Sequence, residues 1–191
     1  MQEKQITIAN ETFKLDKPFI VLATQNPIEQ DGTYPLPEAQ QDRFLMKVKI
    51  EYPTKEEEKN ILKLLTSTTD FDSIEIEEVL NKDKIEELKK LIKEIHIDEK
   101  LMDYILDIIF KTRESNQYIS CGASPRASIA LVVSAKANAF LEGRDFVIPQ
   151  DIKKVIFDVL RHRIILTYEA EAEGKDVEDI ITDIMEGVEL P

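Results

Sequence analysis

The sequence predicts a short α/β portion followed by an all-α portion, so the chain should be mostly helical. Three observations predict this class. Strand-like apolar patterns lie between Ile6 and Ile50, a helical apolar period runs from Thr54 onward, and glycine is scarce, at 5 of 191 residues. We therefore expect two units, residues 1–53 and residues 54–191.

The α/β portion should contain a hairpin and two further strands. Residues 6–8 and 12–15 alternate around a turn, which is typical of a hairpin. Residues 19–22, with the sequence FIVL, form a continuous apolar run, as in a strand covered on both faces inside a sheet. Residues 44–50 should form another strand, which ends before Pro53. Since few partners exist for the strand at 19–22, we expect this chain to be the C-terminal part of a longer protein.

The all-α portion should contain six helices. Thr54 and Glu57 form a capping box at the start of the first, whose apolar face includes Leu65. The other helices are expected over residues 84–95, 98–113, 125–142, 149–163 and 177–188.

Composition excludes several classes of function. The net charge of −13 argues against a nucleic-acid backbone or an anionic membrane as the main partner. No apolar run approaches the ~20 residues of a membrane-spanning helix. The single cysteine, Cys121, excludes an internal disulfide and fits a reducing compartment. These features predict a cytoplasmic protein that neither inserts into membranes nor binds nucleic acid.

Two polar residues follow the predicted strand at 19–22. Asn26 lies just beyond its carboxyl end, where open α/β sheets bind ligands, so its amide could hold a water or a phosphate oxygen. Equally, Asn26 could simply initiate a turn before Pro27. Arg43 closes a short helix that starts at Pro37. It is either a helix-end cation or a guanidinium presented to a phosphate at a subunit edge.

Arg126 lies in the first turn of a helix, with Ser124 as its N-cap and Pro125 at its first position. A cation there opposes the helix dipole, whereas free N–H groups and a guanidinium together attract an anion. We favour an anion site. The alternative is an exposed arginine that pairs with Glu114 or another surface acid.

Other candidate residues indicate no chemistry. His96 and His162 stand alone without metal-ligand spacing, so we predict no metal site and expect surface or hydrogen-bonded histidines. The run from Arg161 to Arg163 ends a helix, where basic residues cap carbonyl groups.

Two long stretches resemble the MoxR family of AAA+ ATPases. They are FIVLATQNPIEQDGTYPLPEAQQDRFLMKVKIEYPTKEEE and CGASPRASIALVVSAKANAFLEGRDFVIPQDIKKVIFDVLRHRIIL. The resemblance implies that residues 1–53 are the C-terminal part of a P-loop αβα nucleotide-binding core. Residues 54–191 would be its helical lid.

The resemblance also implies roles for three residues. Asn26, in ATQNP, corresponds to the sensor-1 residue that orients the attacking water. Arg43, in EAQQDRF, corresponds to the arginine finger that completes the neighbouring subunit's site. Arg126, in SPRA, corresponds to the sensor-2 arginine on the nucleotide phosphates. Two departures from the family pattern are Gln41, usually apolar, and Ile148, where a capping threonine is common.

The family implies ATP and Mg²⁺ as cofactors, a hexameric homo-oligomeric ring, and partners with von Willebrand factor A domains. The expected function is that of the C-terminal portion of an ATPase with a chaperone-like role in assembling or activating protein complexes. No G-x-x-x-x-G-K-[ST] pattern occurs in the 191 residues, so this chain alone should not turn over ATP. The main alternative is a non-catalytic, acidic helical interaction module. An acidic metal-binding scaffold ranks last.

Overall fold

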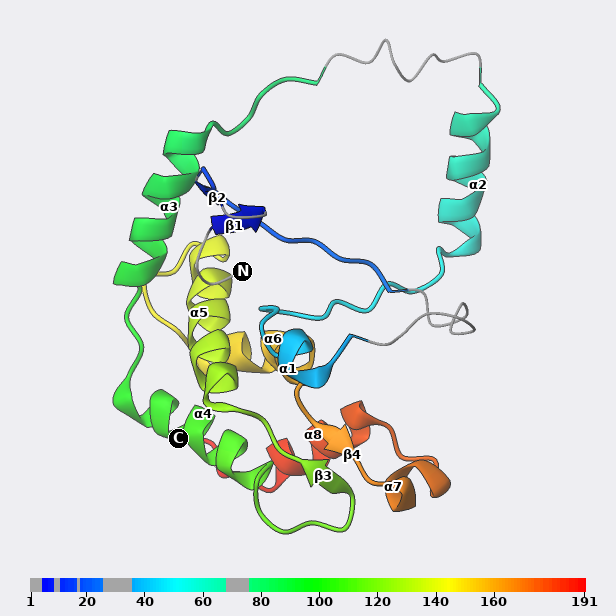
Figure 1. The fold of residues 1–191 in the computed structure, drawn as a ribbon, viewed down its shortest axis with the longest axis vertical. Coiled ribbons are helices and arrows are strands. Elements are labelled where there is room, and N and C mark those ends of the chain that lie inside the picture. Colours follow the sequence, from blue (N-terminus) through cyan, green and yellow to red (C-terminus); the bar gives the residue numbers. More distant parts are fainter. Residues whose placement is uncertain (1–4, 9–10, 17, 26–35, 68–75) are drawn as a thin grey trace.

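The computed structural model describes residues 5–8, 11–16, 18–25, 36–67 and 76–191, which are drawn in colour in Figure 1. In this part of the chain the elements are, in order, β1 (Gln5–Ile8), β2 (Glu11–Lys14), α1 (Glu38–Gln41), α2 (Lys55–Leu65), α3 (Lys82–Glu94), α4 (Glu99–Lys111), β3 (Ile119–Cys121), α5 (Pro125–Leu141), α6 (Pro149–Leu160), β4 (Ile165–Leu166), α7 (Tyr168–Ala172) and α8 (Val177–Glu186). No helix among these residues is long and apolar enough to cross a membrane.

The hydrophobic core lies between four helices, α4, α5, α6 and α8 (Figure 1). Each helix contributes apolar residues spaced three or four apart, so that they share one face of the helix. The fully buried side chains include Ile105, Ile108, Ile109, Leu131, Ile152, Ile156, Leu160, Ile180 and Ile181. This core makes the C-terminal part of the chain a helical domain, as the fold class predicts.

Small side chains let α5 approach its neighbours. Its buried residues include alanines at 127, 130, 135 and 139, each at most 4% exposed. A helix with so little side-chain bulk on its buried face can pack closely, and α5 contacts α3, α4 and α6. The central position of α5 fixes the direction of its N-terminus, which carries the candidate site.

Each predicted helix after Thr54 forms, with ends no more than three residues from the prediction. The predicted hairpin forms as well, with β1 and β2 paired antiparallel from Gln5 opposite Lys14 to Ile8 opposite Glu11. Two features were not predicted. The short strands β3 and β4 pair antiparallel, and Thr167 caps the five-residue helix α7 by accepting a hydrogen bond from the N–H of Ala170 at 3.3 Å.

The predictions of strands at residues 19–22 and 44–50 are wrong for this structure, which has no strand at either place. The side chains of Ile20 and Leu22 are 72% and 91% exposed. A strand that is apolar on both faces needs a neighbour on each side, and the described residues provide none there. Residues 44–47 instead run against the end of α6, where the N–H of Lys47 donates to the carbonyl oxygen of Asp158 at 2.8 Å.

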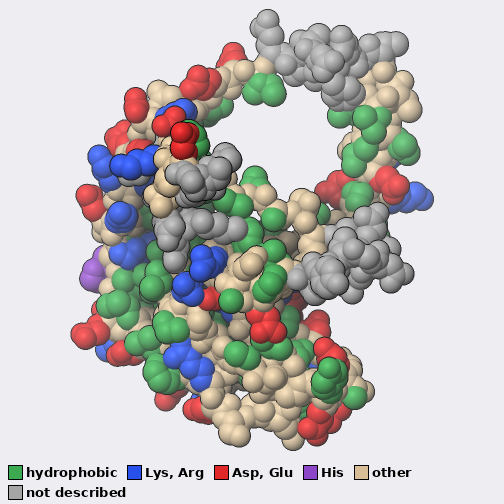
Figure 2. Space-filling model, viewed as in Figure 1, with side chains coloured by type: hydrophobic (Ala, Val, Ile, Leu, Met, Phe, Trp, Pro, Cys, Tyr) green, Lys and Arg blue, Asp and Glu red, His purple; other side chains and the backbone are tan. Residues whose placement is uncertain are grey.

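Helix α2 stands apart from the core (Figure 1). Its predicted capping box is present, because Glu57 Oε2 accepts from the N–H of Thr54 at 2.8 Å and Thr54 Oγ1 accepts from the N–H of Glu57 at 3.3 Å. None of its residues is buried. Its apolar side chains Ile61, Leu62, Leu64 and Leu65 are 45–64% exposed. Figure 2 shows hydrophobic side chains at the surface on the right, where Figure 1 places α2.

The two departures from the family pattern find local solutions. Gln41 Nε2 donates to the carbonyl oxygen of Leu36 at 2.7 Å and so closes α1 on itself. Ile148 has no side-chain acceptor for the N-terminus of α6, but the buried Asp151 carboxylate accepts from the N–H of Ile148 at 2.8 Å. Asp151 also binds Arg144 and Asn138, which locks this helix start in place.

Candidate functional site

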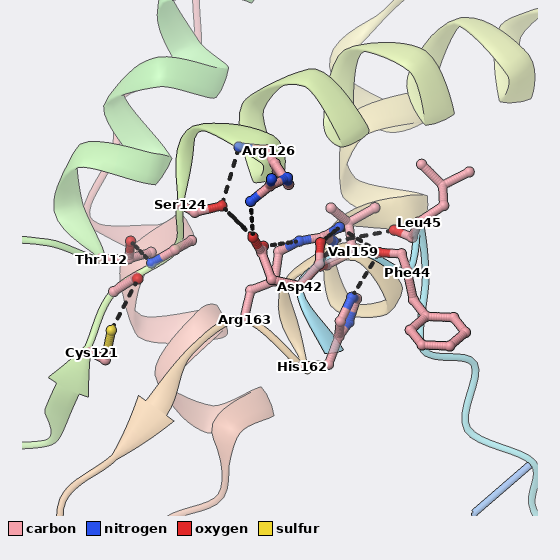
Figure 3. A network of polar contacts seen from close by, with 12 residues as sticks. Asp42, Phe44, Leu45, Thr112, Cys121, Ser124, Arg126, Val159, His162 and Arg163 are labelled. Carbon is pink, nitrogen blue, oxygen red and sulfur yellow. Dashed lines mark hydrogen bonds and ion pairs between the residues drawn. The ribbon is translucent and has the colours of Figure 1, made fainter. Parts of the chain in front are cut away.

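The structure brings the turn after α1 to the N-terminus of α5. Arg126 Nη1 lies 3.2 Å from Asp42 Oδ2, across 84 residues of sequence (Figure 3). Arg43 follows Asp42 directly and is exposed. Two of the three predicted site residues, Arg43 and Arg126, are therefore connected through Asp42. The third, Asn26, lies outside the described residues.

The N-terminus of α5 is built as its sequence predicts. Ser124 is the N-cap, and its Oγ accepts from the N–H of Arg126 at 3.2 Å, with Pro125 in the first turn. The same hydroxyl donates toward the Asp42 carboxylate, whose oxygens lie 2.9 and 3.0 Å away. An anion at a helix N-terminus is stabilised by free N–H groups and the helix dipole. In this structure the carboxylate of Asp42 lies at this helix end, bound by the side chains of Ser124 and Arg126.

The loop before α5 is held tightly against α4. The Thr112 hydroxyl accepts from the N–H of Ala123 at 3.0 Å, and Arg113 Nε donates to the carbonyl oxygen of Ala123 at 2.7 Å. Gly122 comes so close that a Cβ atom on it would lie 2.3 Å from the carbonyl oxygen of Thr112. Only glycine fits this approach without a backbone shift. The core helix α4 therefore fixes where Ser124 stands.

Asp42 binds three side chains at once. Besides Ser124 and Arg126, Arg163 Nε donates to its Oδ1 at 3.1 Å. Burial alone raises the pKa of Asp42, but the hydrogen bonds from Ser124, Arg126 and Arg163 outweigh it and hold the pKa below its ordinary value. The carboxylate is therefore charged at neutral pH. Because two guanidinium groups share one carboxylate, the cluster keeps a net positive charge.

Arg163 is the buried anchor of this cluster, with a side chain only 2% exposed. Its guanidinium donates to the carbonyl oxygens of Asp42 at 3.2 Å, Phe44 at 2.5 Å and Leu45 at 3.2 Å. It also donates to the carbonyl oxygen of Val159 at the end of α6, so the predicted capping of helix carbonyls is present. What the sequence did not predict is that Arg163 also holds the segment around Arg43.

His162 supports the same segment. One ring nitrogen, Nε2, lies 3.1 Å from the carbonyl oxygen of Phe44, while Nδ1 is buried without a partner among the described residues. Burial and, to a smaller extent, the neighbouring Arg163 together lower the pKa of His162 to about 4. The ring is therefore neutral at pH 7 and Nε2 carries the proton that it donates to Phe44. By contrast, His96 is exposed, as expected.

The surface acid that pairs with Arg126 is Asp42 and not Glu114, which lies 2.9 Å from Lys111 instead. The Arg126 side chain remains 44% exposed, so much of its guanidinium still faces solvent. Within the described residues the Arg43 guanidinium has no hydrogen bond or ion pair. Both groups can therefore reach an anion outside this chain's own fold.

The donor groups of the site fit phosphate and do not fit a metal ion. Guanidinium N–H groups and a capped helix N-terminus are typical phosphate ligands. Mg²⁺ requires oxygen ligands, usually one or two carboxylates, and no group of three His, Cys, Asp or Glu residues in the described part of the chain could hold a metal.

Two family models match the chain. The model described as AAA lid domain matches residues 111–184, and the model described as ATPase family associated with various cellular activities matches residues 1–46. The first match contains α5 and α6 with Arg126 and Arg163. The second contains Asp42 and Arg43.

Relatives match over the entire chain. Chaperone MoxR1 of Mycobacterium tuberculosis is 40% identical and YeaC of Bacillus subtilis, an uncharacterized protein, is 41% identical; each match covers 100% of this chain. The chain spans 52% and 59% of their lengths. The solved structure of a candidate ATPase from Cytophaga hutchinsonii is 44% identical, with a TM-score of 0.90 over 100% of this chain and 59% of that one. Over its whole length, this chain is therefore similar to the MoxR family of AAA+ ATPases.

Proposed function

We propose that this chain acts as the C-terminal portion of a full-length MoxR-type ATPase. That protein would couple ATP binding and hydrolysis to the chaperone-like assembly or activation of protein complexes. The name of the Mycobacterium tuberculosis relative, Chaperone MoxR1, supports the chaperone-like part. The shares of 52–59% of the relatives' lengths support the view that further sequence completes the enzyme.

One observation carries this proposal: an exposed arginine at a capped helix N-terminus adjoins the turn that presents Arg43. In the proposal, Arg126 contacts nucleotide phosphates and Arg43 reaches the nucleotide of a neighbouring subunit. Asn26 orients the attacking water. Such groups suit phosphoryl transfer, because its catalysis consists mostly of positioning and of stabilising charge on the transferred oxygens.

The remaining parts of the enzyme are assigned to the full-length protein. The P-loop that holds the ATP phosphates, and the carboxylates that hold Mg²⁺, would come from sequence before this chain. A neighbouring subunit is proposed because an exposed Arg43 needs a second nucleotide site to act upon, and the family resemblance implies that the subunits form a hexameric ring. Partners with von Willebrand factor A domains are proposed on the family resemblance alone.

The first test compares single variants of the full-length protein. Arg126→Ala should weaken ATP binding measured by calorimetry or lower the steady-state turnover, because a phosphate ligand is lost. The control is Lys90→Ala, which removes an exposed cation from α3. If Arg126→Ala matches both the wild type and this control in affinity and turnover, the phosphate role of Arg126 is wrong.

A second test uses the 191-residue chain by itself. Without a P-loop it should neither hydrolyse ATP nor bind it tightly, since isolated arginines cannot replace a cradle of backbone N–H groups and a lysine. Calorimetry that detects micromolar ATP binding would contradict this expectation. If the full-length protein shows no ATPase activity under any condition, the non-catalytic interaction module becomes the better proposal.

A further inference from the structure

We propose that Asp42 is a positioning residue that locks the turn bearing Arg43 to the lid, so that the lid position set by Arg126 decides where Arg43 points. The inference rests on the proposed function, because it takes Arg126 as a phosphate contact and Arg43 as a group acting on a neighbouring subunit. It adds the connection between these two roles. That connection runs through two residues, Asp42 and Arg163.

The first half of the connection joins Asp42 to the N-terminus of α5. Its carboxylate accepts from the Ser124 hydroxyl at 2.9 Å and from Arg126 Nη1 at 3.2 Å (Figure 3). Both donors belong to the first turn of α5 or its cap. The residue immediately before Arg43 is therefore fixed to the same helix end that presents Arg126.

The second half holds the backbone on both sides of Arg43. Arg163 donates to the carbonyl oxygen of Asp42, which precedes Arg43, and to that of Phe44, which follows it. Since the Arg163 side chain is 2% exposed, it has little freedom to move relative to the core. With both flanking peptides held by one buried guanidinium, the Arg43 turn must move with the lid.

Arg126 can respond to phosphate without breaking this connection. Its side chain is 44% exposed, whereas the Asp42 side chain is only 16% exposed and keeps Ser124 and Arg163 as partners. A phosphate that draws Arg126 away from Asp42 therefore leaves Asp42 attached to the lid. A lid that moves toward bound phosphate carries Arg43 along.

The test replaces the charge of Asp42 with the least change in shape. Asp42→Asn in the full-length protein keeps an oxygen acceptor but removes the charge that holds the two arginines. Turnover should fall about 10- to 100-fold, the scale of a misplacement of about 1 Å at a catalytic group. The ATP dissociation constant should not rise, because the charge of Asp42 competes with phosphate for Arg126 and the substitution removes that charge. Asp103→Asn makes the same change on the exposed face of α4 and should alter neither quantity.

Mixed rings distinguish positioning from general damage. An Asp42→Asn subunit keeps its own P-loop, so a neighbour with an intact Arg43 but no P-loop lysine should restore activity at their boundary. Arg43→Ala subunits should be rescued by the same partner. The double variant Asp42→Asn with Arg43→Ala should be no slower than Arg43→Ala alone, because both changes remove the same contribution, that of Arg43 at the neighbouring nucleotide.

Each outcome decides between the two proposals. If Arg43→Ala is rescued by mixing but Asp42→Asn is not, the positioning role of Asp42 is overturned and the proposed function stands. If Arg43→Ala is not rescued in rings of confirmed mass, the finger role fails and takes this inference with it. Should Asp42→Asn fail to assemble, Ser124→Gly replaces it. The change removes the hydroxyl that binds Asp42, and the capping bond that is lost with it costs little stability because glycine is an adequate N-cap. Its smaller loss of turnover must also be rescued by mixing, or the positioning role is wrong.

Discussion

Residues 18–25 and helix α4 are both rich in large apolar side chains, but only α4 buries them. In α4, Ile105, Ile108 and Ile109 are at most 1% exposed, because α5 and α8 lie against the face that they share. In residues 18–25, Leu22 is 91% exposed and no strand forms. Apolar sequence therefore makes structure only where the chain supplies a partner. We expect residues 18–25 to need contacts with protein surface outside this chain, whereas α4 should be stable on the contacts that the chain itself supplies.

The largest effect is expected at Arg43, which is exposed like residues 18–25 and is proposed to act on a neighbouring subunit. In the full-length protein, Arg43→Ala should lower turnover by about 10³-fold or more, the scale at which arginine fingers act on transferring phosphate. ATP binding should stay close to wild type, since the subunit's own P-loop supplies most of the affinity. Turnover and calorimetric affinity measured on the same preparation check this. Equal losses in both would place Arg43 at its own nucleotide.

Shortening an apolar side chain should lower the stability of the protein in α4 but not in residues 18–25. Ile109→Ala should lower the free energy of unfolding by about 2–5 kcal/mol, because it removes buried methyl groups and leaves a cavity. The control Leu22→Ala removes similar bulk from an exposed site and should change it by no more than about 0.5 kcal/mol. Urea unfolding of the 191-residue chain measures both.

Hydrogen exchange offers an independent check on the same contrast. Amides of residues 19–22 should exchange quickly in the monomeric chain, whereas those in the middle of α5 should be protected. Full protection of residues 19–22 in a monomer would show that this region finds its partners within the chain, and the contrast would fail.

Acid should weaken the contact between the end of α6 and the segment around Phe44 through His162. Its folded pKa of about 4 lies below the ordinary 6.5, so the unfolded chain binds more protons between these values. Unfolding free energy should therefore fall as the pH drops from 6.5 to 4. The loss should be about 1–3 kcal/mol, since solvent screens a half-buried ring. His162→Gln still donates to Phe44 but cannot titrate, so its unfolding free energy should vary less over this range. Identical pH profiles would refute the assignment.

The smallest effect is expected at the cap of α2. Thr54→Ala should cost the local helix about 1 kcal/mol by removing the N-cap acceptor. Because α2 buries no residue, unfolding of the core should change by less than about 0.5 kcal/mol. Circular dichroism at low temperature and the midpoint of urea unfolding report these two quantities separately. A core midpoint that falls with the helix signal would mean that α2 packs on the core in solution.

The sequence was sufficient for features that depend on local chemistry. Ser124 and Thr54 cap helices as predicted, since N-cap preferences act within one turn. Strands were predicted at 19–22 and 44–50 from apolar runs, and these failed because a strand also needs partners outside its own sequence. The sequence of α7 does carry a usable signal, which is a capping threonine followed by good helix formers.

The central contacts of the candidate site could not be predicted. Nothing in the local sequence pairs Asp42 with Arg163, which lies 121 residues later. The pattern around Asp42 fits a helix end, and that around Arg163 fits a capping cation, so each residue had a sufficient local explanation. Only the packing of α6 and α5 brings the carboxylate and the guanidinium together.

The separation of 121 residues between Asp42 and Arg163 also sets an order of events during synthesis. A ribosome adds about 5–20 residues per second, so Asp42 exists for at least about 6 s before its anchor is made. During that interval residues 44–47 lack the end of α6, against which they lie in the folded chain. The nascent protein is thus most vulnerable to aggregation before α6 is complete, and slow translation of this region would prolong the exposure.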